Sequence, residues 1–538
     1  MIIKAFRQSV RPNIRFIRSF LEENHVPEKY LLGVDIGTSS TKGILMNSSG
    51  DIVASHYSGH EVNIIKPGQM EQDPIRCYWN GFKVVVKEIL KKSRIAPREI
   101  VGVGVSALSP SIVPIDRNGN PVRRAILYSD RRATHECKEL IENVGIEEII
   151  KKTYNFPDPY FGGYKILWYK KAEEENYKKT WKILNAEKFV VFKLTGKAVI
   201  DKATASVYAP YFDMKSGRWT NDLASVIGGD IDVLPEEIYE SHEVVGYVTA
   251  DASRETGLSP GTPVIACGPD SLMSSLSIGS IDDGDSALMY GSTSCWYVVT
   301  ERLLYEPRGR LLSSYYVVPN RYVLGGEMVT TGSILRWFCE NFAHKEMELS
   351  RRIGKSPYEL LDEEAEKVAP GSGGIIILPY FFGERTPIWN PDARGVIYGL
   401  TIAHNRAHIY RAILESVGYA IKQHIEIAKS LGIEVREIRA TNGGAKSRLW
   451  RKIISDITGI KQLYSKKTLG APMGDAFLTG VGVGVFRKFS DIRSLINDLE
   501  ITSPDKELFE LYNRFFEIYL EIYRATESYL DKLNRLTK

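Results

Sequence analysis

The sequence predicts an α/β protein of two domains, and its length, its alternation of patterns and an internal repeat lead to this prediction. The chain has 538 residues, which exceeds the size that one hydrophobic core usually serves. Apolar runs of strand length alternate with longer helical patterns, as they do in α/β folds. The strand-turn-strand pattern of residues 30–46 recurs at residues 284–299, and such self-similarity indicates a duplication.

In the first half, three strands joined by short turns open the pattern and predict a mixed sheet. The expected strands cover residues 30–34, 43–46, 51–56, 100–105 and 112–115, with a helix over residues 75–92. Helical stretches are then expected up to about residue 226.

In the second half, strands are expected at residues 284–290, 295–299, 313–318, 374–378 and 435–441. Helices are expected at residues 332–342, 405–430 and 447–458. A charged helix over residues 505–536 ends the pattern, and we interpret it as a solvated face.

Composition argues against several classes of protein. The net charge is only +4 and Lys and Arg are scattered, so no nucleic-acid partner is implied. No run approaches 18 uninterrupted apolar residues, so we expect no membrane span. The five cysteines never form C-x-x-C and the nine histidines never form H-E-x-x-H. We therefore expect reduced thiols, no structural zinc and a cytoplasmic protein.

Residues 1–29 differ from the chain that follows. Five basic residues, the first of them Lys4 and the last Arg18, stand between apolar residues and are compatible with a basic amphipathic helix. A targeting role stays open, but the segment has no secretory apolar core and no small-residue cleavage site. We interpret it as an N-terminal extension.

The turn between the first two strands carries an acid, a glycine, hydroxyl groups and a lysine. Gly37 lets a backbone amide come close to a phosphate, and Asp35 is placed to hold a hydrated Mg²⁺. The hydroxyl groups and the lysine can donate to phosphate oxygens. Turns are also rich in Gly, Ser and Thr for conformational reasons, so a plain turn is the alternative. The turn residues concerned are Asp35, Gly37, Thr38, Ser39, Ser40 and Lys42.

The second half offers two more candidate nucleotide contacts. Residues 291–293 form the hydroxyl-rich turn of the repeated unit, and residues 443–445 lie between an expected strand and an expected helix. A glycine pair before a helix is typical of nucleotide sites, because the backbone can approach the ligand and the helix end is electropositive.

Several of these segments together resemble the FGGY family of carbohydrate kinases, which includes glycerol, xylulose, gluconate and fuculose kinases. The most specific element is residues 395–400, continued at His408 and at residues 412–415, which agrees with the family's C-terminal signature. Further similarity lies at residues 33–42, 70–74, 128–132, 383–387 and 442–445. The N-terminal signature is matched only in part, because Gly162 stands where the family has Pro, Ser or Thr.

The resemblance implies two ribonuclease-H-like domains of the actin and hexokinase type, with an ATP and sugar cleft between them. Residues 30–277 would form the sugar-binding domain and residues 278–538 the ATP-binding domain. The implied activity is ATP-dependent transfer of the γ-phosphate of MgATP to a hydroxyl of a small sugar. The motifs are closest to xylulose kinase, so a ketopentose such as xylulose is the first candidate. Glycerol, another polyol, gluconate or another ketose are alternatives. A nucleotide-switched sugar sensor or a chaperone-like ATPase is the non-enzyme alternative.

The resemblance also implies roles for single residues. Asp270, which follows an apolar strand and a Gly-Pro turn, matches the base that removes the proton from the substrate hydroxyl. A turn or cap residue is the alternative for such an acid. Asp35 is implied to act on Mg²⁺ through water. The residues implied to bind ATP are Gly37, Thr38, Ser39, Ser40, Lys42, Gly291, Ser292, Thr293, Gly332, Gly443, Gly444 and Ala445.

The choice of sugar rests on residues where the chain departs from its relatives. Xylulose kinases typically carry a Met-His pair, and glycerol kinases an Arg-Glu pair, where this chain has Leu108, Ser109 and Pro110. Asp270 is followed by Ser271, where xylulose kinases usually have Asn. These residues are the predicted substrate contacts. The implied cofactors are ATP and Mg²⁺, the implied partner is a small sugar or polyol, and a homodimer stays open.

Overall fold

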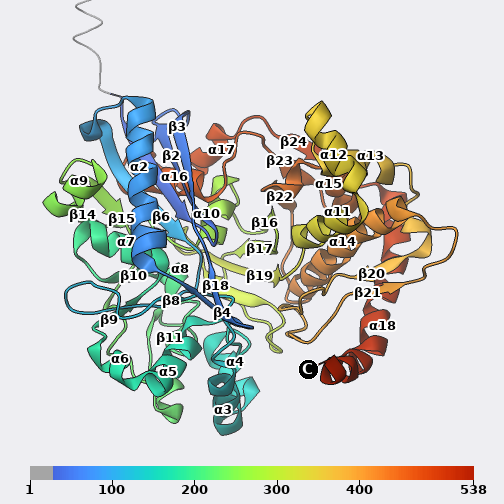
Figure 1. Ribbon diagram of the computed structural model, residues 1–538, viewed down its shortest axis with the longest axis horizontal. Coiled ribbons are helices and arrows are strands. Elements are labelled where there is room, and N and C mark those ends of the chain that lie inside the picture. The colour runs from blue at the N-terminus through green and yellow to red at the C-terminus, as the bar shows by residue number, and fades with distance from the viewer. Residues whose placement is uncertain (1–27, 538) are drawn as a thin grey trace, which may run out of the picture.

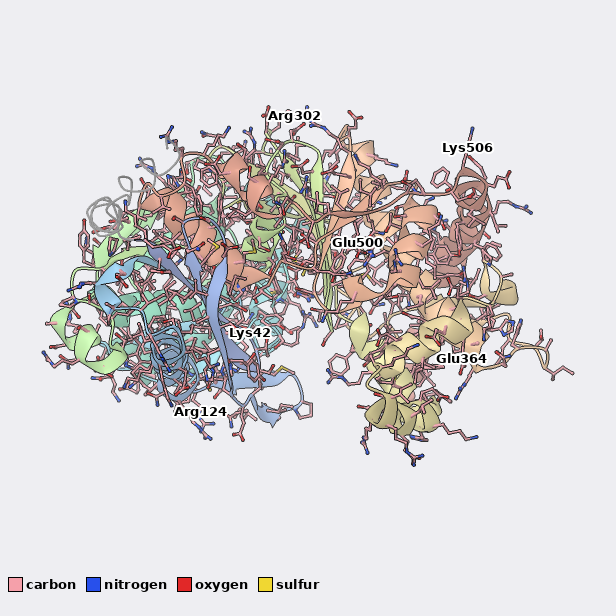
Figure 2. All side chains as sticks on the ribbon, turned by 90° about the horizontal axis from the view of Figure 1, so that it is seen from above. Lys42, Arg124, Arg302, Glu364, Glu500 and Lys506 are labelled. Atoms are coloured by element: carbon pink, nitrogen blue, oxygen red, sulfur yellow. The ribbon has the colours of Figure 1, made fainter. Side chains whose placement is uncertain are left out.

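The computed structural model describes residues 28–537, which form two lobes, each built on a mixed β-sheet (Figure 1). Figure 2 places Lys42 in one lobe and Glu364, Glu500 and Lys506 in the other. Residues 1–27 of the predicted N-terminal extension lie outside the described residues.

The first sheet has six strands, with β1 and β6 at its centre. In spatial order these are β14 (Val244–Tyr247), β15 (Pro263–Ile265), β6 (Ile100–Ala107), β1 (Tyr30–Ile36), β2 (Ser40–Asn47) and β3 (Ile52–Gly59). β1, β2 and β3 are antiparallel neighbours, whereas β6 runs parallel to both β1 and β15. The predicted opening hairpins and the mixed sheet are therefore confirmed.

The second sheet has seven strands and repeats this pattern. In spatial order these are β18 (Leu312–Tyr315), β19 (Tyr322–Met328), β17 (Ser294–Thr300), β16 (Asp285–Tyr290), β22 (Glu437–Thr441), β23 (Gln462–Tyr464) and β24 (Glu500–Thr502). β17 pairs antiparallel with both β19 and β16. β22 pairs parallel with both β16 and β23, and β23 pairs antiparallel with β24. The first sheet shows the same succession from β3 to β14. The repeat seen in the sequence is thus a repeat of sheet topology.

Short strands and helices complete both lobes. The minor strands are β4 (Asn63–Lys66), β5 (Gln69–Gln72), β7 (Val113–Ile115), β8 (Ala125–Ile126), β9 (Lys182–Leu184), β10 (Val199–Asp201), β11 (Phe212–Asp213), β12 (Arg218–Trp219), β13 (Glu237–Tyr239), β20 (Ile376–Leu378) and β21 (Val396–Tyr398). The helices of the first half are α2 (Asn80–Ser93), α3 (Thr134–Val144), α4 (Ile146–Thr153), α5 (Gly162–Ala172), α6 (Glu174–Lys179), α7 (Ala186–Thr195), α8 (Lys202–Ala205), α9 (Ala250–Thr256) and α10 (Asp270–Ser277). Those of the second half are α11 (Gly332–Phe342), α12 (His344–Ile353), α13 (Pro357–Ala365), α14 (Arg406–Ser430), α15 (Arg448–Thr458), α16 (Ala471–Gly482), α17 (Ile492–Leu495) and α18 (Lys506–Thr537).

Two helices, α10 and α16, lie between the two sheets and pack against each other. α16 covers β1 and β6 of the first sheet, although it comes from the second half of the chain, while α10 contacts β16 of the second sheet (Figure 1). On β16, Ala287 and Met289 point into this central core, and Leu288 and Tyr290 point into the outer core of the second lobe. The predicted division between residues 277 and 278 stays a prediction.

Glycines bring α16 unusually close to its neighbours. A Cβ atom on Gly33 of β1 would lie 2.1 Å from the carbonyl oxygen of Pro472 and 2.6 Å from the amide nitrogen of Ala476. A Cβ atom on Gly474 of α16 would lie 2.1 Å from the carbonyl oxygen of Met273 in α10. Backbone lies against backbone at both contacts, so neither position has room for a side chain.

Three expectations need correction. Residues 129–226 are not helical throughout, because β9, β10, β11 and β12 interrupt them; strands of two or three residues are too short to show a period. β19 was missed altogether. The last helix, α18, is not only a solvated face: Tyr512 and Tyr519 are fully buried, and the Tyr512 hydroxyl donates to Glu415 at 2.8 Å.

Within residues 28–537, no helix combines the length and the apolar character needed to cross a membrane.

We predict that Gly33→Ala lowers the free energy of unfolding by about 1–3 kcal/mol, because the new methyl group would overlap backbone atoms of α16. Urea denaturation of the purified protein measures this change. Gly59→Ala is the matched control, since a Cβ atom there would meet nothing nearer than 3.6 Å. Equal stability losses in the two variants would contradict the proposed close contact.

Candidate active site

A cavity of about 250 Å³ lies where the two central helices begin and both hairpin turns converge. It is lined by Asp35, Gly37, Thr38 and Lys42 of the first turn, Gly291 and Thr293 of the second, Asp270 and Ser271 of α10, and Ala471 and Pro472 of α16. The structure therefore brings the two predicted turns to one cavity.

Hydrogen bonds from His60, from Gln72 and within the turn itself hold the first turn in place. The Gly37 amide donates to the Ser40 carbonyl oxygen at 2.9 Å, and Nε2 of His60 lies 2.9 Å from the Gly37 carbonyl oxygen. The Gln72 side-chain amide donates to the Thr38 carbonyl oxygen at 2.7 Å. These bonds fix the turn and leave the Lys42 side chain exposed beside the cavity.

The second turn is docked on the start of α11. The amide of Gly332 donates to the Gly291 carbonyl oxygen, and that of Thr331 to the Ser292 carbonyl oxygen, both at 3.0 Å. A Cβ atom on Gly332 would lie 2.6 Å from the Gly291 oxygen. The position of this turn therefore depends on the glycine at residue 332.

A larger cavity of about 720 Å³ adjoins the first, and Gly291 lines both. Its wall includes Tyr290, Tyr358, Tyr410 and Trp450, together with Ser292, Gly332, Gly443, Gly444 and Lys446. A Cβ atom on Gly443 would meet no heavy atom within 4 Å, so the backbone there is open to a ligand. An aromatic wall with accessible backbone fits a nucleoside, and the shared Gly291 would let its phosphates reach the first turn.

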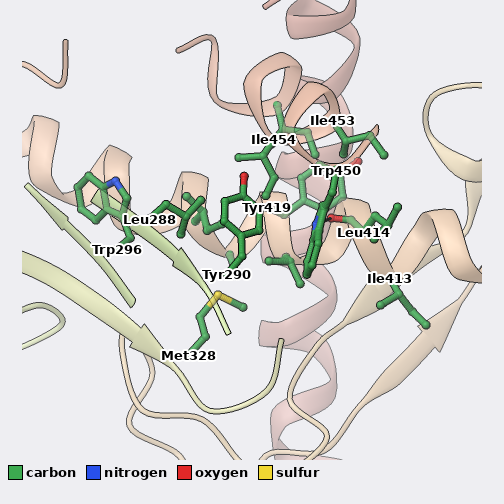
Figure 3. Packing of buried hydrophobic residues seen from close by; sticks show 14 of the residues in the cluster. Leu288, Tyr290, Trp296, Met328, Ile413, Leu414, Tyr419, Trp450, Ile453 and Ile454 are labelled. Carbon is green, nitrogen blue, oxygen red and sulfur yellow. Dashed lines mark hydrogen bonds between the residues drawn. The ribbon is translucent and has the colours of Figure 1, made fainter. Parts of the chain in front are cut away.

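Two residues of the aromatic wall, Tyr290 and Trp450, pack in the hydrophobic core of the second lobe (Figure 3). The rings of Tyr290 and Trp450 meet edge to face with centroids 5.2 Å apart. The indole nitrogen of Trp450 donates to the Leu414 carbonyl oxygen at 3.1 Å. Protein contacts therefore hold Tyr290 and Trp450 in place.

Asp270 is the first residue of α10 and faces the smaller cavity. The Ser271 amide donates to its carboxylate at 2.7 Å. Burial raises the pKa of Asp270 well above the ordinary aspartate range, and the nearby Asp35 and Glu327 carboxylates raise it further. A carboxylate with a raised pKa beside a cavity has the property that a general base requires.

Asp35 is the penultimate residue of β1, beside the first turn, and is the candidate contact for Mg²⁺. Burial raises the pKa of Asp35 to about 6, against the opposing effects of Lys42 and of the Ser106 hydroxyl, which lies 3.4 Å away. Among residues 28–537, no group of three or more His, Cys, Asp or Glu side chains could hold a metal ion. A carboxylate beside the two hairpin turns fits Mg²⁺, which usually keeps several waters and is bound by one or two carboxylates together with substrate phosphates.

Four predicted site residues do not line either cavity. Ser39 is exposed, and its carbonyl oxygen accepts a hydrogen bond from the His60 amide, while Ser40 is buried. Pro110 is buried and packs against Gly162. Ala445 is buried, and its carbonyl oxygen accepts a hydrogen bond from Arg451. Of the predicted substrate contacts in this segment, Leu108 and Ser109 do line the smaller cavity.

Sequence reasoning missed two charged residues in the smaller cavity, Glu327 and Arg385. Glu327 is the lone acid of the otherwise apolar or glycine residues of β19, and that isolation was a usable signal. Arg385 stands within residues 383–387, a segment that carries the family resemblance, but no role followed from it.

Asp475 of α16 was also missed and lies fully buried behind Asp35. The Ser106 hydroxyl donates to it at 2.8 Å, and the Cys267 thiol lies 3.3 Å from its other oxygen. Burial raises the pKa of Asp475 well above its ordinary range, and the Asp35 carboxylate adds to this. An acid inside an apolar helical run was the signal for it.

Family models and relatives agree with this geometry. The N-terminal domain of the FGGY family of carbohydrate kinases matches residues 30–277, and its C-terminal domain matches residues 286–483. Gluconokinase of Bacillus subtilis is 27% identical over 501 residues, which are 93% of this chain and 96% of the relative. Xylulose kinase of the same species is 27% identical over 500 residues, which are 93% of this chain and 97% of the relative.

Solved structures show the same fold. Xylulose kinase from Rhodospirillum rubrum superposes with a TM-score of 0.83 at 28% identity, over 94% of this chain and 100% of that one. Gluconate kinase from Lactobacillus acidophilus gives 0.86 at 23% identity, over 94% and 100%. With both family domains matched across most of its length, the chain belongs to the FGGY family of carbohydrate kinases and is a sugar phosphotransferase.

Proposed function

We propose that the chain transfers the γ-phosphate of MgATP to a hydroxyl group of a small sugar, with a ketopentose such as xylulose as the first candidate. The observation that carries this proposal is that Asp270 faces the cavity to which both hairpin turns contribute. Family membership supports a kinase over the sensor and chaperone-like alternatives. The relatives include gluconokinases as well as xylulose kinases, so they do not select one substrate. Gluconate, glycerol, other polyols and other ketoses are the alternatives.

The larger cavity would hold the nucleoside. Among the aromatic residues of its wall Tyr358 is exposed, and Gly443 offers open backbone. From there the phosphates would pass Gly291 and Gly332 toward Lys42, whose ammonium group can donate to phosphate oxygens. Bound Mg²⁺ neutralises charge on the transferring phosphate, and Asp35 is the residue that would hold it through water.

The smaller cavity would hold the sugar against α10. The Ser109 hydroxyl is buried there and has no hydrogen-bond partner in the described part of the chain, so it is available to a substrate hydroxyl. Ser271 and Leu108 line the same space. Asp270 would accept the proton of the hydroxyl that attacks the phosphate, and the fixed start of α10 would orient it.

We predict that Asp270→Asn lowers kcat by about 10²–10⁴-fold, because an amide cannot accept the hydroxyl proton. ATP binding, measured by calorimetry, should change little. The assay is sugar-dependent ADP release, and Asp222→Asn on the exposed surface is the control. Substantial phosphorylation by the Asp270→Asn variant would remove Asp270 as the base.

A coupled ADP-release screen over pentuloses, hexuloses, polyols, gluconate and glycerol tests the activity itself. We expect sugar-dependent release, with the highest kcat/KM for a ketopentose. If no compound in the screen stimulates ADP release, the proposed function is wrong.

Gly332→Ala should raise the KM for ATP by about tenfold while leaving the KM for the sugar little changed, because the methyl group would push the second turn away from α11. Steady-state kinetics with each substrate varied in turn measure both constants. An unchanged KM for ATP would show that this turn does not position the nucleotide.

A further inference from the structure

The sugar end of the smaller cavity holds an ion pair that the mechanism above does not use. Glu327, the penultimate residue of β19, pairs with Nη1 of Arg385, and their side chains are only 7% and 12% exposed. The guanidinium group also stands over the Tyr160 ring, 5.2 Å from its centroid. The other Glu327 oxygen accepts a hydrogen bond from the Tyr297 hydroxyl. Both charged residues line the cavity together with Asp270.

This end of the cavity therefore has the carboxyl groups of Asp270 and Glu327 and the guanidinium group of Arg385, which is already paired with Glu327. Lys42 is the other cation among the described residues that line the cavity, and it belongs to the first phosphate turn. No unpaired positive charge at the sugar end is left, within the described lining, to receive an anionic group on a substrate.

The pair is held in place by the backbone around it. The Glu327 amide donates to the Thr386 hydroxyl oxygen at 2.6 Å, and that hydroxyl donates back to the Glu327 carbonyl oxygen at 3.1 Å. The Arg385 amide donates to the buried Glu384 carboxylate at 2.9 Å. These bonds fix the backbones of Glu327 and Arg385, while the ion pair and the Tyr160 ring hold the guanidinium itself.

A neutral sugar suits these groups and a sugar acid does not. A sugar hydroxyl can donate to a carboxylate and accept from the remaining N–H groups of Arg385. The carboxylate of an aldonate only accepts hydrogen bonds, and it would lose its hydration beside Glu327 and Asp270 without gaining a free cation. A pocket that rejects a competitor commonly does so through such a repulsive element.

We propose that the Glu327–Arg385 pair determines the substrate class, admitting uncharged sugars and polyols and rejecting sugar acids such as gluconate. This inference rests on the proposed kinase function and adds two specificity-determining residues to it.

The test compares kcat/KM for the best neutral sugar of the screen with kcat/KM for gluconate, in the wild type and in Glu327→Gln. The wild type should favour the neutral sugar by roughly 100-fold or more, the size of a like-charge penalty. Glu327→Gln keeps the shape but leaves Arg385 unpaired, so this ratio should fall by at least about tenfold, mainly through a lower KM for gluconate. The matched control is Glu306→Gln, which removes another buried partner of an arginine, Arg310, outside the cavity.

A second measurement needs no variant. Gluconate and glucitol differ only in the end group that carries the charge, so each can be titrated as an inhibitor of the wild type against the best sugar. Glucitol should inhibit at a concentration about tenfold or more below that of gluconate.

The outcomes separate the two proposals. A wild type that prefers gluconate, a folded Glu327→Gln variant with an unchanged ratio, or equal inhibition by gluconate and glucitol would each overturn the specificity role while leaving the kinase intact. If no sugar in the screen stimulated ADP release, the proposed function would instead be overturned.

Discussion

The close contact of α16 with β1 and α10 is the constraint on which the site depends. Gly33 and Gly474 let backbone lie against backbone, so the two central helices can shift little against the sheet or each other. Both helices begin at the cavity, where α10 presents Asp270 and α16 presents Ala471 and Pro472. The close packing at Gly33 and Gly474 thus sets the position of Asp270, the candidate base, relative to the two turns.

The same packing gathers acids in a place with little water. Asp35, Asp270 and Asp475 come from a strand and two helices, and burial raises the pKa of each. Carboxylates that share such a space repel one another unless cations accompany them. The region beside the two hairpin turns is therefore complementary to a divalent cation and a cationic side chain, while Glu327 elsewhere in the cavity is already paired with Arg385.

Local features of the chain could be predicted and long-range contacts could not. The opening hairpins, the helix at residues 332–342 and the two glycine-containing turns follow from apolar periodicity and turn chemistry, which are properties of neighbouring residues. Whether Ser106 meets Asp475, or Glu327 meets Arg385, depends on how sheets and helices pack after they form. The family resemblance supplied Asp270, and Glu327 and Asp475 stood out as lone acids in apolar segments, but nothing local to the chain said which partners these acids would meet.

The position of α16 has a consequence for how the protein is made. The first sheet is complete in sequence by residue 265, yet one of its faces is covered by residues 471–482. While the ribosome adds the intervening stretch of roughly 200 residues, at about 5–20 residues per second, the apolar side chains of that face lack their partner for about 10–40 s. The emerging first half therefore exposes this apolar face until α16 has been made, and the protein acquires a finished first lobe only when its second lobe is nearly complete.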